Sequence, residues 1–165
     1  MQRIALFLGS LLLSGAAIAA PIKSIGKHGS WEAFAIEDKS GKVCYAATSP
    51  DKKKSENKTP TFFMVTHGPG KNNANVVSLT TGFKFKEKSE VEIGIGKVKH
   101  KLFTKDDGAW AVNAEIDKAI IKAMREGKNI TMKVTPAKGK AMVDTYSLEG
   151  FNQAITVINK ACGIK

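Results

Sequence analysis

Apolar and polar side chains alternate along much of the chain, and a period of two predicts β-strands. The clearest alternation covers residues 97–104. One face of that segment carries Val98, His100 and Leu102, and the other carries mainly lysines. Turn-forming residues, such as those at 38–41, separate neighbouring segments, so we expect hairpins and an antiparallel sheet. The predicted strands cover residues 31–37, 42–48, 61–67, 75–81, 82–86, 91–95, 97–104, 109–112, 130–136 and 141–146.

Two segments have helical spacing instead. Residues 113–125 place four apolar side chains on one face, with Asn113 as the N-cap and Gly127 as the stop. Residues 148–161 follow the same pattern after Ser147, which we predict as their N-cap. Many short strands and two short helices predict an all-β fold, either an antiparallel β-sandwich or a barrel.

Two polar segments interrupt this pattern. Residues 20–29 contain Pro21 and two glycines, and we interpret them as a short leader. Residues 49–60 have a proline near each end, four lysines and no other apolar side chain. We expect this second segment to be an exposed, mobile loop.

The first nineteen residues have the pattern of a secretory signal peptide. Arg3 provides a positive start, residues 4–13 are uncharged, and Ala17-Ile18-Ala19 fits the cleavage pattern. The apolar run is too short to span a membrane, which needs about 20 apolar residues. We therefore expect a signal peptide at 1–19 and a single domain at 20–165, located in the periplasm, at the outer surface or in the medium.

The chain is strongly basic, with 26 lysines and arginines against 15 acidic residues. Without Arg3 the balance is 25 against 15, or +10, and Arg125 is then the only arginine. Readers of specific nucleic-acid sequences favour arginine for its bidentate fork, so we expect no specific nucleic-acid partner. A lysine surface suits an anionic envelope component, an acidic protein or plain solubility.

Two cysteines, Cys44 and Cys162, are present. An even count in an exported chain favours a disulfide, and only one pairing is possible. The alternative is a redox pair or a metal site, but the sequence has no C-x-x-C motif and no cluster of further ligands. The bridge would tie the early strands to the last helix.

The histidines provide little evidence of catalysis. His28, His67 and His100 lack the spacing of a metal site, so we expect no metal and no cofactor. The turn at 68–70 after His67 is reminiscent of an oxyanion loop, but no G-x-S-x-G motif accompanies it. We interpret His100 as a strand residue with a satisfied hydrogen bond.

Other candidate residues also favour structural roles. Glu90 and Glu92 are two apart and would share a strand face, but lysines surround them, so surface pairing is favoured over acid–base chemistry. The glycines at 94–96 lack the G-K-[ST] ending of a phosphate loop and are typical of close strand packing. Trp31 and Trp110 could stack on a ligand, but we favour positions in the core.

Several motifs point to a known family. Residues 144–151 read DTYSLEGF, and Ala154 and Cys162 follow them. Trp31 precedes a predicted hairpin whose second strand contains Cys44. This pattern resembles the invasion-associated locus B family, exported proteins of alphaproteobacteria, over essentially the whole mature chain.

The resemblance implies an immunoglobulin-like antiparallel β-sandwich. It supplies no catalytic residues to carry over. The family often has a cysteine at the position of Ala35, so a bridge that used it is absent here and Cys44–Cys162 remains. We expect Trp31, Phe151 and Ile155 in the core.

Three functional hypotheses follow. We favour a non-catalytic envelope protein that binds an anionic or protein partner in the periplasm or at the cell surface. The first alternative is an envelope hydrolase that uses His67 or the Glu90/Glu92 pair. The second is a factor that aids host-cell invasion, as the family name implies. The sequence leaves the partner and the oligomeric state open.

Overall fold

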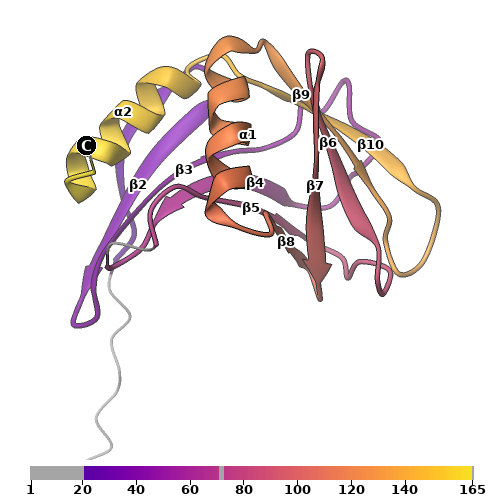
Figure 1. The fold of residues 1–165 in the computed structure, drawn as a ribbon, viewed down its shortest axis with the longest axis horizontal. Helices are drawn as coiled ribbons and strands as arrows, with labels where there is room; N and C mark the ends of the chain where they lie inside the picture. The colour runs from indigo at the N-terminus through magenta and orange to yellow at the C-terminus, as the bar shows by residue number, and fades with distance from the viewer. Residues whose placement is uncertain (1–20, 71–72, 165) are drawn as a thin grey trace, which may run out of the picture.

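The computed structural model describes residues 21–70 and 73–164, which form ten strands and two helices. The strands make one sheet in the order β1-β2-β3-β4-β5-β8-β7-β6-β9-β10, and every pairing is antiparallel (Figure 1). The helices are α1 (Ala114–Glu126) and α2 (Phe151–Cys162). The strands are β1 (Lys23–His28), β2 (Trp31–Asp38), β3 (Gly41–Thr48), β4 (Thr61–His67), β5 (Val76–Thr81), β6 (Glu90–Ile95), β7 (Val98–Lys105), β8 (Gly108–Trp110), β9 (Asn129–Val134) and β10 (Met142–Ser147).

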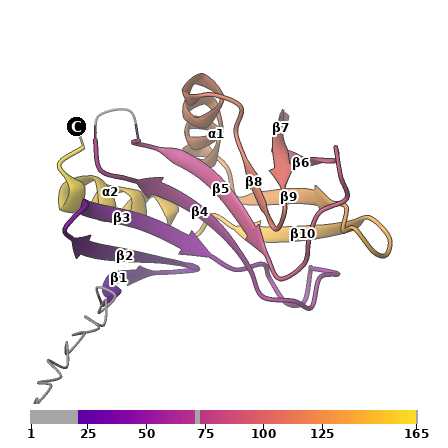
Figure 2. The ribbon, with the colours of Figure 1, turned by 90° about the horizontal axis from the view of Figure 1, so that it is seen from below.

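The predicted class, an antiparallel all-β fold with two short helices, is confirmed. The sheet curves so that its two halves face each other as the layers of an open sandwich (Figures 1 and 2). Phe63 of β4 meets Tyr146 of β10 with ring centroids 6.0 Å apart, although these strands are far apart in the sheet order. Helix α2 packs on β1, β2 and β3, while α1 lies against β5 and β7. The signal-peptide prediction lies outside the described residues.

The core matches the apolar positions that the sequence singles out. Trp31, Phe151 and Ile155 are fully buried, as predicted. Trp31 contacts Phe151 at 4.9 Å between ring centroids, and its indole N–H donates to the Ser147 carbonyl at 3.0 Å. This contact joins the start of β2 to the start of α2, so the tryptophan links the sheet to its covering helix.

Two strand predictions were wrong. Residues 20–29 are not only a leader, because β1 pairs with β2 over most of its length. This edge strand carries one large apolar side chain, Ile25, so it shows little alternation. Residues 82–86 do not form a strand; Phe85 makes one isolated bridge, to Pro136. Their alternation arises because Phe83 and Phe85 pack on the core while the intervening lysine faces out.

The first helix begins and ends where predicted. The Asn113 side chain accepts from the backbone N–H groups of Glu115 and Ile116, and the Gly127 N–H donates to the Ala123 carbonyl. The second helix starts at Phe151 with Gly150 as N-cap, so the predicted N-cap at Ser147 was wrong. Ser147 instead caps the preceding turn, where its hydroxyl accepts from the Glu149 N–H.

The prediction of a mobile loop at 49–60 needs correction. Its lysines are exposed, but Ser55 and Asn57 are buried and the segment lies along the edge of β10. The Asn57 N–H donates to Asp144, the Ser55 hydroxyl accepts from the Thr145 N–H, and the Asp51 N–H donates to the Thr145 carbonyl. Polar side chains thus replace a neighbouring strand and cover an edge that would otherwise be open to aggregation.

Candidate functional site

The outer face of β2, β3 and β4 is unusually apolar for a sheet surface. Along each strand one set of side chains enters the core, and the alternate set, which should be polar, is mostly aromatic or aliphatic here. Phe34 of β2 pairs with Tyr45 of β3, and Ala47 of β3 pairs with Met64 of β4. Phe62 lies at the start of β4 and is 46% exposed.

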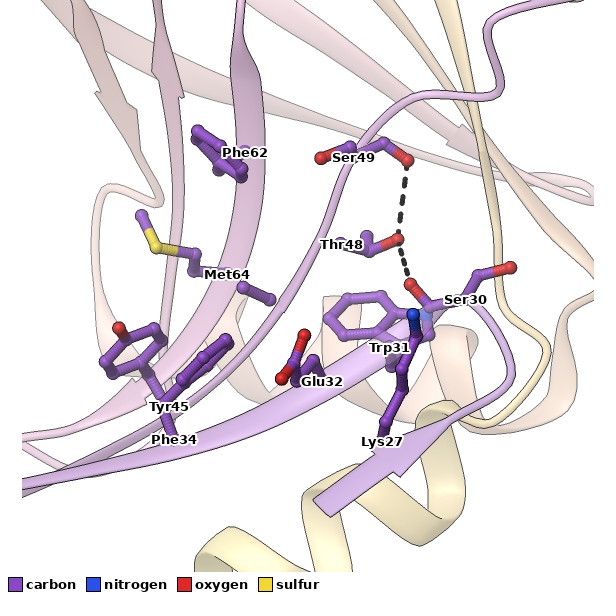
Figure 3. Close-up of a pocket in the computed structure, with 11 residues that line it drawn as sticks. Lys27, Ser30, Trp31, Glu32, Phe34, Tyr45, Thr48, Ser49, Phe62 and Met64 are labelled. Carbon is purple, nitrogen blue, oxygen red and sulfur yellow. Dashed lines mark hydrogen bonds between the residues drawn. The ribbon is translucent and has the colours of Figure 1, made fainter. Parts of the chain in front are cut away.

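These side chains line a groove of about 430 Å³ (Figure 3). The rings of Phe34 and Tyr45 stack with centroids 4.9 Å apart and planes at 19°. Trp31 lies behind Thr48 and Ser30 at one end and has no exposed surface, so the core prediction for it is confirmed. The groove therefore offers stacked, partly exposed rings to a ligand rather than a closed cavity.

Polar groups lie along one side of the groove. Lys27 and Glu32 border it, and the Ser24 hydroxyl donates to Glu32 at 2.6 Å. Burial, and secondarily the charge of Glu32, raises the pKa of the Tyr45 phenol, so this ring is neutral at physiological pH. The Thr48 hydroxyl donates to the Ser30 carbonyl at 2.8 Å and so supports this end of the groove.

A second hollow of about 620 Å³ adjoins the groove and shares Ser49 and Phe62 with it. The loop at 49–60 forms this hollow, and Lys52 and Lys58 line it. Lys58 donates to the Ser55 carbonyl at 3.2 Å, which holds its ammonium group beside the hollow. An apolar groove thus continues into a basic one, and the aromatic ring of Phe62 lies between them.

His67 is a structural residue in this fold. It is fully buried at the end of β4, where its Nδ1 accepts from the Asn75 N–H at 3.0 Å. Its Nε2 therefore carries the proton and donates to the Asn159 side chain of α2 at 2.8 Å. Burial lowers the pKa of His67, and the hydrogen bond to Asn159 partly opposes this shift. Both nitrogens are engaged, so neither is available as a base.

The stability contribution of His67 should depend on pH. Because the native pKa lies below the ordinary value near 6.5, the unfolded chain binds more protons in this window. The contribution is complete above about pH 6.5 and is lost as the pH falls toward the lowered native pKa. We expect the difference in unfolding free energy between wild type and His67→Gln, measured by urea denaturation, to shrink from pH 7.5 to pH 5.

Two buried carboxyl groups change stability with pH in the opposite direction to His67. Their effect cancels when wild type is compared with His67→Gln. Burial raises the pKa of Asp117 and of Asp144, so each favours the native state as the pH falls. Both proteins in the comparison carry them, and their effect cancels in the difference. A wild-type–variant difference that stayed constant from pH 7.5 to pH 5 would contradict a buried, neutral His67.

Glu90 and Glu92 do not meet His67. Between β4 and β6 lie three strands, a separation of about 19 Å along the sheet at the usual spacing. Both glutamates are exposed, and Glu90 pairs with Lys101 at 2.6 Å, as the surface interpretation predicts. The acid–base pair of the hydrolase hypothesis is therefore not assembled by these residues.

The remaining candidates have structural surroundings. Gly94 lies against Thr131 of β9, where a side chain would meet the Thr131 hydroxyl, so the prediction of close strand packing is confirmed. Trp110 is half-buried and lies outside the core, so the core prediction for it was wrong; its ring contacts Phe103 at 5.8 Å. His100 is in β7 as predicted, but its Nε2 has no hydrogen-bond partner, so the expectation of a satisfied bond was wrong.

The cysteines join the sheet to the last helix. Cys44 of β3 and Cys162 of α2 form a disulfide with 6.0 Å between their Cα atoms. Cys44 is the cross-strand neighbour of His67, so the bridge and the His67–Asn159 bond hold the same end of α2. Across residues 21–70 and 73–164, no three metal-binding side chains come together. No helix in that part of the chain has the length and apolarity to cross a membrane.

The sequence alone did not lead us to predict the outer groove. Its signal is present in residues 61–67 (TFFMVTH), where Phe62 and Met64 occupy the alternate positions that a half-exposed strand fills with polar residues. Such a run also fits a strand buried on both faces. Only the absence of a covering layer over β2–β4 distinguishes the two cases.

Comparison with known proteins agrees with this architecture. The family model described as "Invasion associated locus B (IalB) protein" matches residues 31–159. A search of curated proteins gives no match. The crystal structure of invasion associated protein B from Bartonella henselae is similar, with a TM-score of 0.59 and 21% identity over 82% of this chain and 96% of that one. At this identity the likeness shows a shared fold.

Proposed function

This chain belongs to the invasion associated locus B family, and we propose that it is an exported, non-catalytic protein that binds an anionic partner through the groove on β2–β4. The observation that carries the proposal is the stacked pair Phe34–Tyr45, which leads past Phe62 into a hollow lined by Lys52 and Lys58. Exposed apolar surface that is continuous with a basic rim is typical of a binding site.

The two parts of the site would contribute differently. Aromatic rings supply contact area at low cost in conformational entropy and commonly dominate binding energy. The lysines would attract an anion from a distance and set its orientation, an effect that salt screens within about 8 Å at physiological ionic strength. Across the described residues only two ion pairs form, those of Lys54 and Lys101, so most lysine charge is free to act on a partner.

The hydrolase hypothesis has less support. A hydrolytic site needs a nucleophile or activated water next to a base and a group that orients the base. His67, the best candidate base, is enclosed by Asn75 and Asn159, and Glu90 is paired with Lys101. We therefore propose that the protein acts by binding a partner and not by hydrolysis.

Location and biological role follow from the same proposal. A signal peptide at 1–19 would deliver a domain of residues 20–165 to the periplasm, the outer surface or the medium, where a disulfide persists. For this chain, a role in host-cell invasion would be partner binding directed at a host or envelope surface. Comparing invasion by a deletion strain with that of a strain complemented by a groove variant would test that role.

Phe62→Ser should weaken partner binding about tenfold with little effect on stability, because the ring is 46% exposed. The mature protein would capture its partner from envelope extract at low salt, and the dissociation constant of the captured partner would then be measured at low and high salt. Ile22→Ser is the control, because Ile22 is 62% exposed and lines neither this groove nor the adjoining hollow. Equal loss in both variants, or binding insensitive to salt, would refute the proposal.

A further inference from the structure

Half of β7 has a neighbouring strand on one side only. On one side, β7 pairs with β6 from Val98 to Phe103. On the other side it pairs with β8 only through Phe103, Thr104 and Lys105, because β8 is three residues long. After Trp110 the chain leaves the sheet and enters α1, which stands beside β7 in Figure 1. Residues 98–102 therefore present an unpaired strand edge in the middle of the sheet.

The register identifies the backbone groups at this edge. Ile95 and Val98 flank a two-residue turn, so they form a hydrogen-bonded pair, and such pairs alternate with non-bonded pairs along an antiparallel ladder. His100 and Leu102 then bond to β6, whereas the N–H and C=O groups of Lys99 and Lys101 point away from it. Among the backbone bonds of the described loops and turns, none reaches Lys99 or Lys101.

A groove of about 810 Å³ includes this edge and continues across β7 to residues of β6, β9 and β10. Ile116 of α1 and His100 line it on the inner side, and Phe103 and Lys101 line it on the outer side. The described residues include six exposed large apolar side chains, and three of these line this groove: Phe103, Val112 and Val143. A fourth, Val98, lies on β7 itself. Phe103, Val112 and Val98 thus place apolar surface near this half-paired stretch of β7, whereas Val143 lies on β10 at the far end of the groove.

We propose that this edge is a docking site for an extended segment of another protein, which adds as an antiparallel strand beside residues 98–102 of β7. In strand addition, backbone hydrogen bonds supply affinity, and alternate side chains of the guest supply specificity. Here the guest would take its backbone bonds from Lys99 and Lys101. This surface is separate from the groove on β2–β4 and does not depend on the function proposed for it.

Charge at the edge selects the guest. Lys99 has no ion-pair partner within the described residues, and Lys101, Lys133 and Lys99 outnumber Glu90 and Glu92 around the groove. The guest residue opposite Lys99 would therefore be acidic, since opposite charges stabilise cross-strand pairs, and an acidic residue opposite Lys101 would share that lysine with Glu90. The alternate guest residues would face His100 and Ile116 and would be apolar. A second copy of β7 is unsuitable, because antiparallel pairing would place lysines opposite lysines.

The test uses a soluble, capped hexapeptide of alternating glutamate and valine, with a lysine–valine hexapeptide as charge control. In the free protein, NMR should show fast hydrogen exchange for the amides of Lys99 and Lys101 and slow exchange for those of His100 and Leu102. Saturating glutamate–valine peptide should slow exchange of the Lys99 and Lys101 amides at least tenfold. Protection of these two amides without peptide, or peptide binding that leaves them unprotected, would overturn the proposal.

Two substitutions separate the backbone bond from the charge. Lys99→Gln removes only the ammonium group and should weaken peptide binding severalfold. Lys99→Pro also removes an N–H that makes no bond within the sheet, so the fold should survive while binding falls at least a further tenfold. Slow exchange of the His100 and Leu102 amides in both variants would confirm an intact hairpin. Equal affinity of the two variants, or of the two peptides, would refute strand addition, whereas Phe62→Ser should leave peptide affinity unchanged.

Discussion

Removal of the Cys44–Cys162 disulfide is expected to lower the free energy of unfolding by about 4–5 kcal/mol. The bridge spans 118 residues, so it restricts the unfolded chain over most of the domain. Cys44→Ala/Cys162→Ala would be compared with oxidised wild type by urea denaturation at constant pH.

Reduced wild-type protein provides the control for this measurement. Cys44 is fully buried, and alanine there removes packing as well as the cross-link. Reduction removes the cross-link and leaves both sulfur atoms in place. If the bridge stabilises mainly by restricting the unfolded chain, reduced wild type loses most of the unfolding free energy that the double variant loses. A reduced protein as stable as the oxidised one would assign the loss to packing instead.

The bridge is one of several attachments that hold helix α2 on the sheet. Helix α2 covers β1–β3, and its C-terminal end is held by Cys162 and by the bond from His67 to Asn159. The opposite end is held by Phe151 and Gly150 against Trp31 and His28. These attachments at the two ends, together with the buried Ala154, Ile155 and Ile158 between them, fix the helix over the sheet.

The alternation of apolar and polar residues predicted this fold because most of its strands bury one face and expose the other. Residues 97–104 and 113–125 carry a local pattern strong enough to identify strand and helix without knowledge of their neighbours. Edge strand β1 was missed because its face away from the core carries lysine and serine, which resemble a leader. The segment at 49–60 was misjudged for a related reason, since Ser55 and Asn57 are buried by hydrogen bonds that hydrophobicity does not register.

The candidate sites depend on pairings that no local pattern contains. Residues 109–112 were predicted as one strand, but β8 ends at Trp110 because Asn113 already caps α1. That early end leaves Lys99 and Lys101 without a second neighbour. The groove on β2–β4 likewise exists because no helix covers that face. The edge of β7 and the face of β2–β4 are both sites where a neighbouring element is missing. Such a site can be recognised only once the positions of all the elements are known.

Gly150 is the second position where we expect a large effect, because two backbone segments cross there. It has a φ of 86°, and a side chain at this position would overlap the His28 carbonyl. On the other side of the crossing, the Ser30 N–H donates to the Glu149 carbonyl at 3.0 Å. Gly150→Ala should lower the free energy of unfolding by about 3–5 kcal/mol, from left-handed strain of 1–2 kcal/mol plus overpacking.

Gly163→Ala separates the two contributions, since Gly163 also has a positive φ, 66°, but open space around it. It should cost only the strain, about 1–2 kcal/mol. Gly29→Ala probes the same crossing from β1, because a side chain there would lie 2.6 Å from the Glu149 carbonyl oxygen. Once one alanine has pushed the segments apart, the second costs less, so the double variant Gly29→Ala/Gly150→Ala should be less destabilised than the sum of the single variants. Additive losses, or equal losses at Gly150 and Gly163, would show that the crossing is not closely packed and that the Gly150 motif serves only to turn the chain.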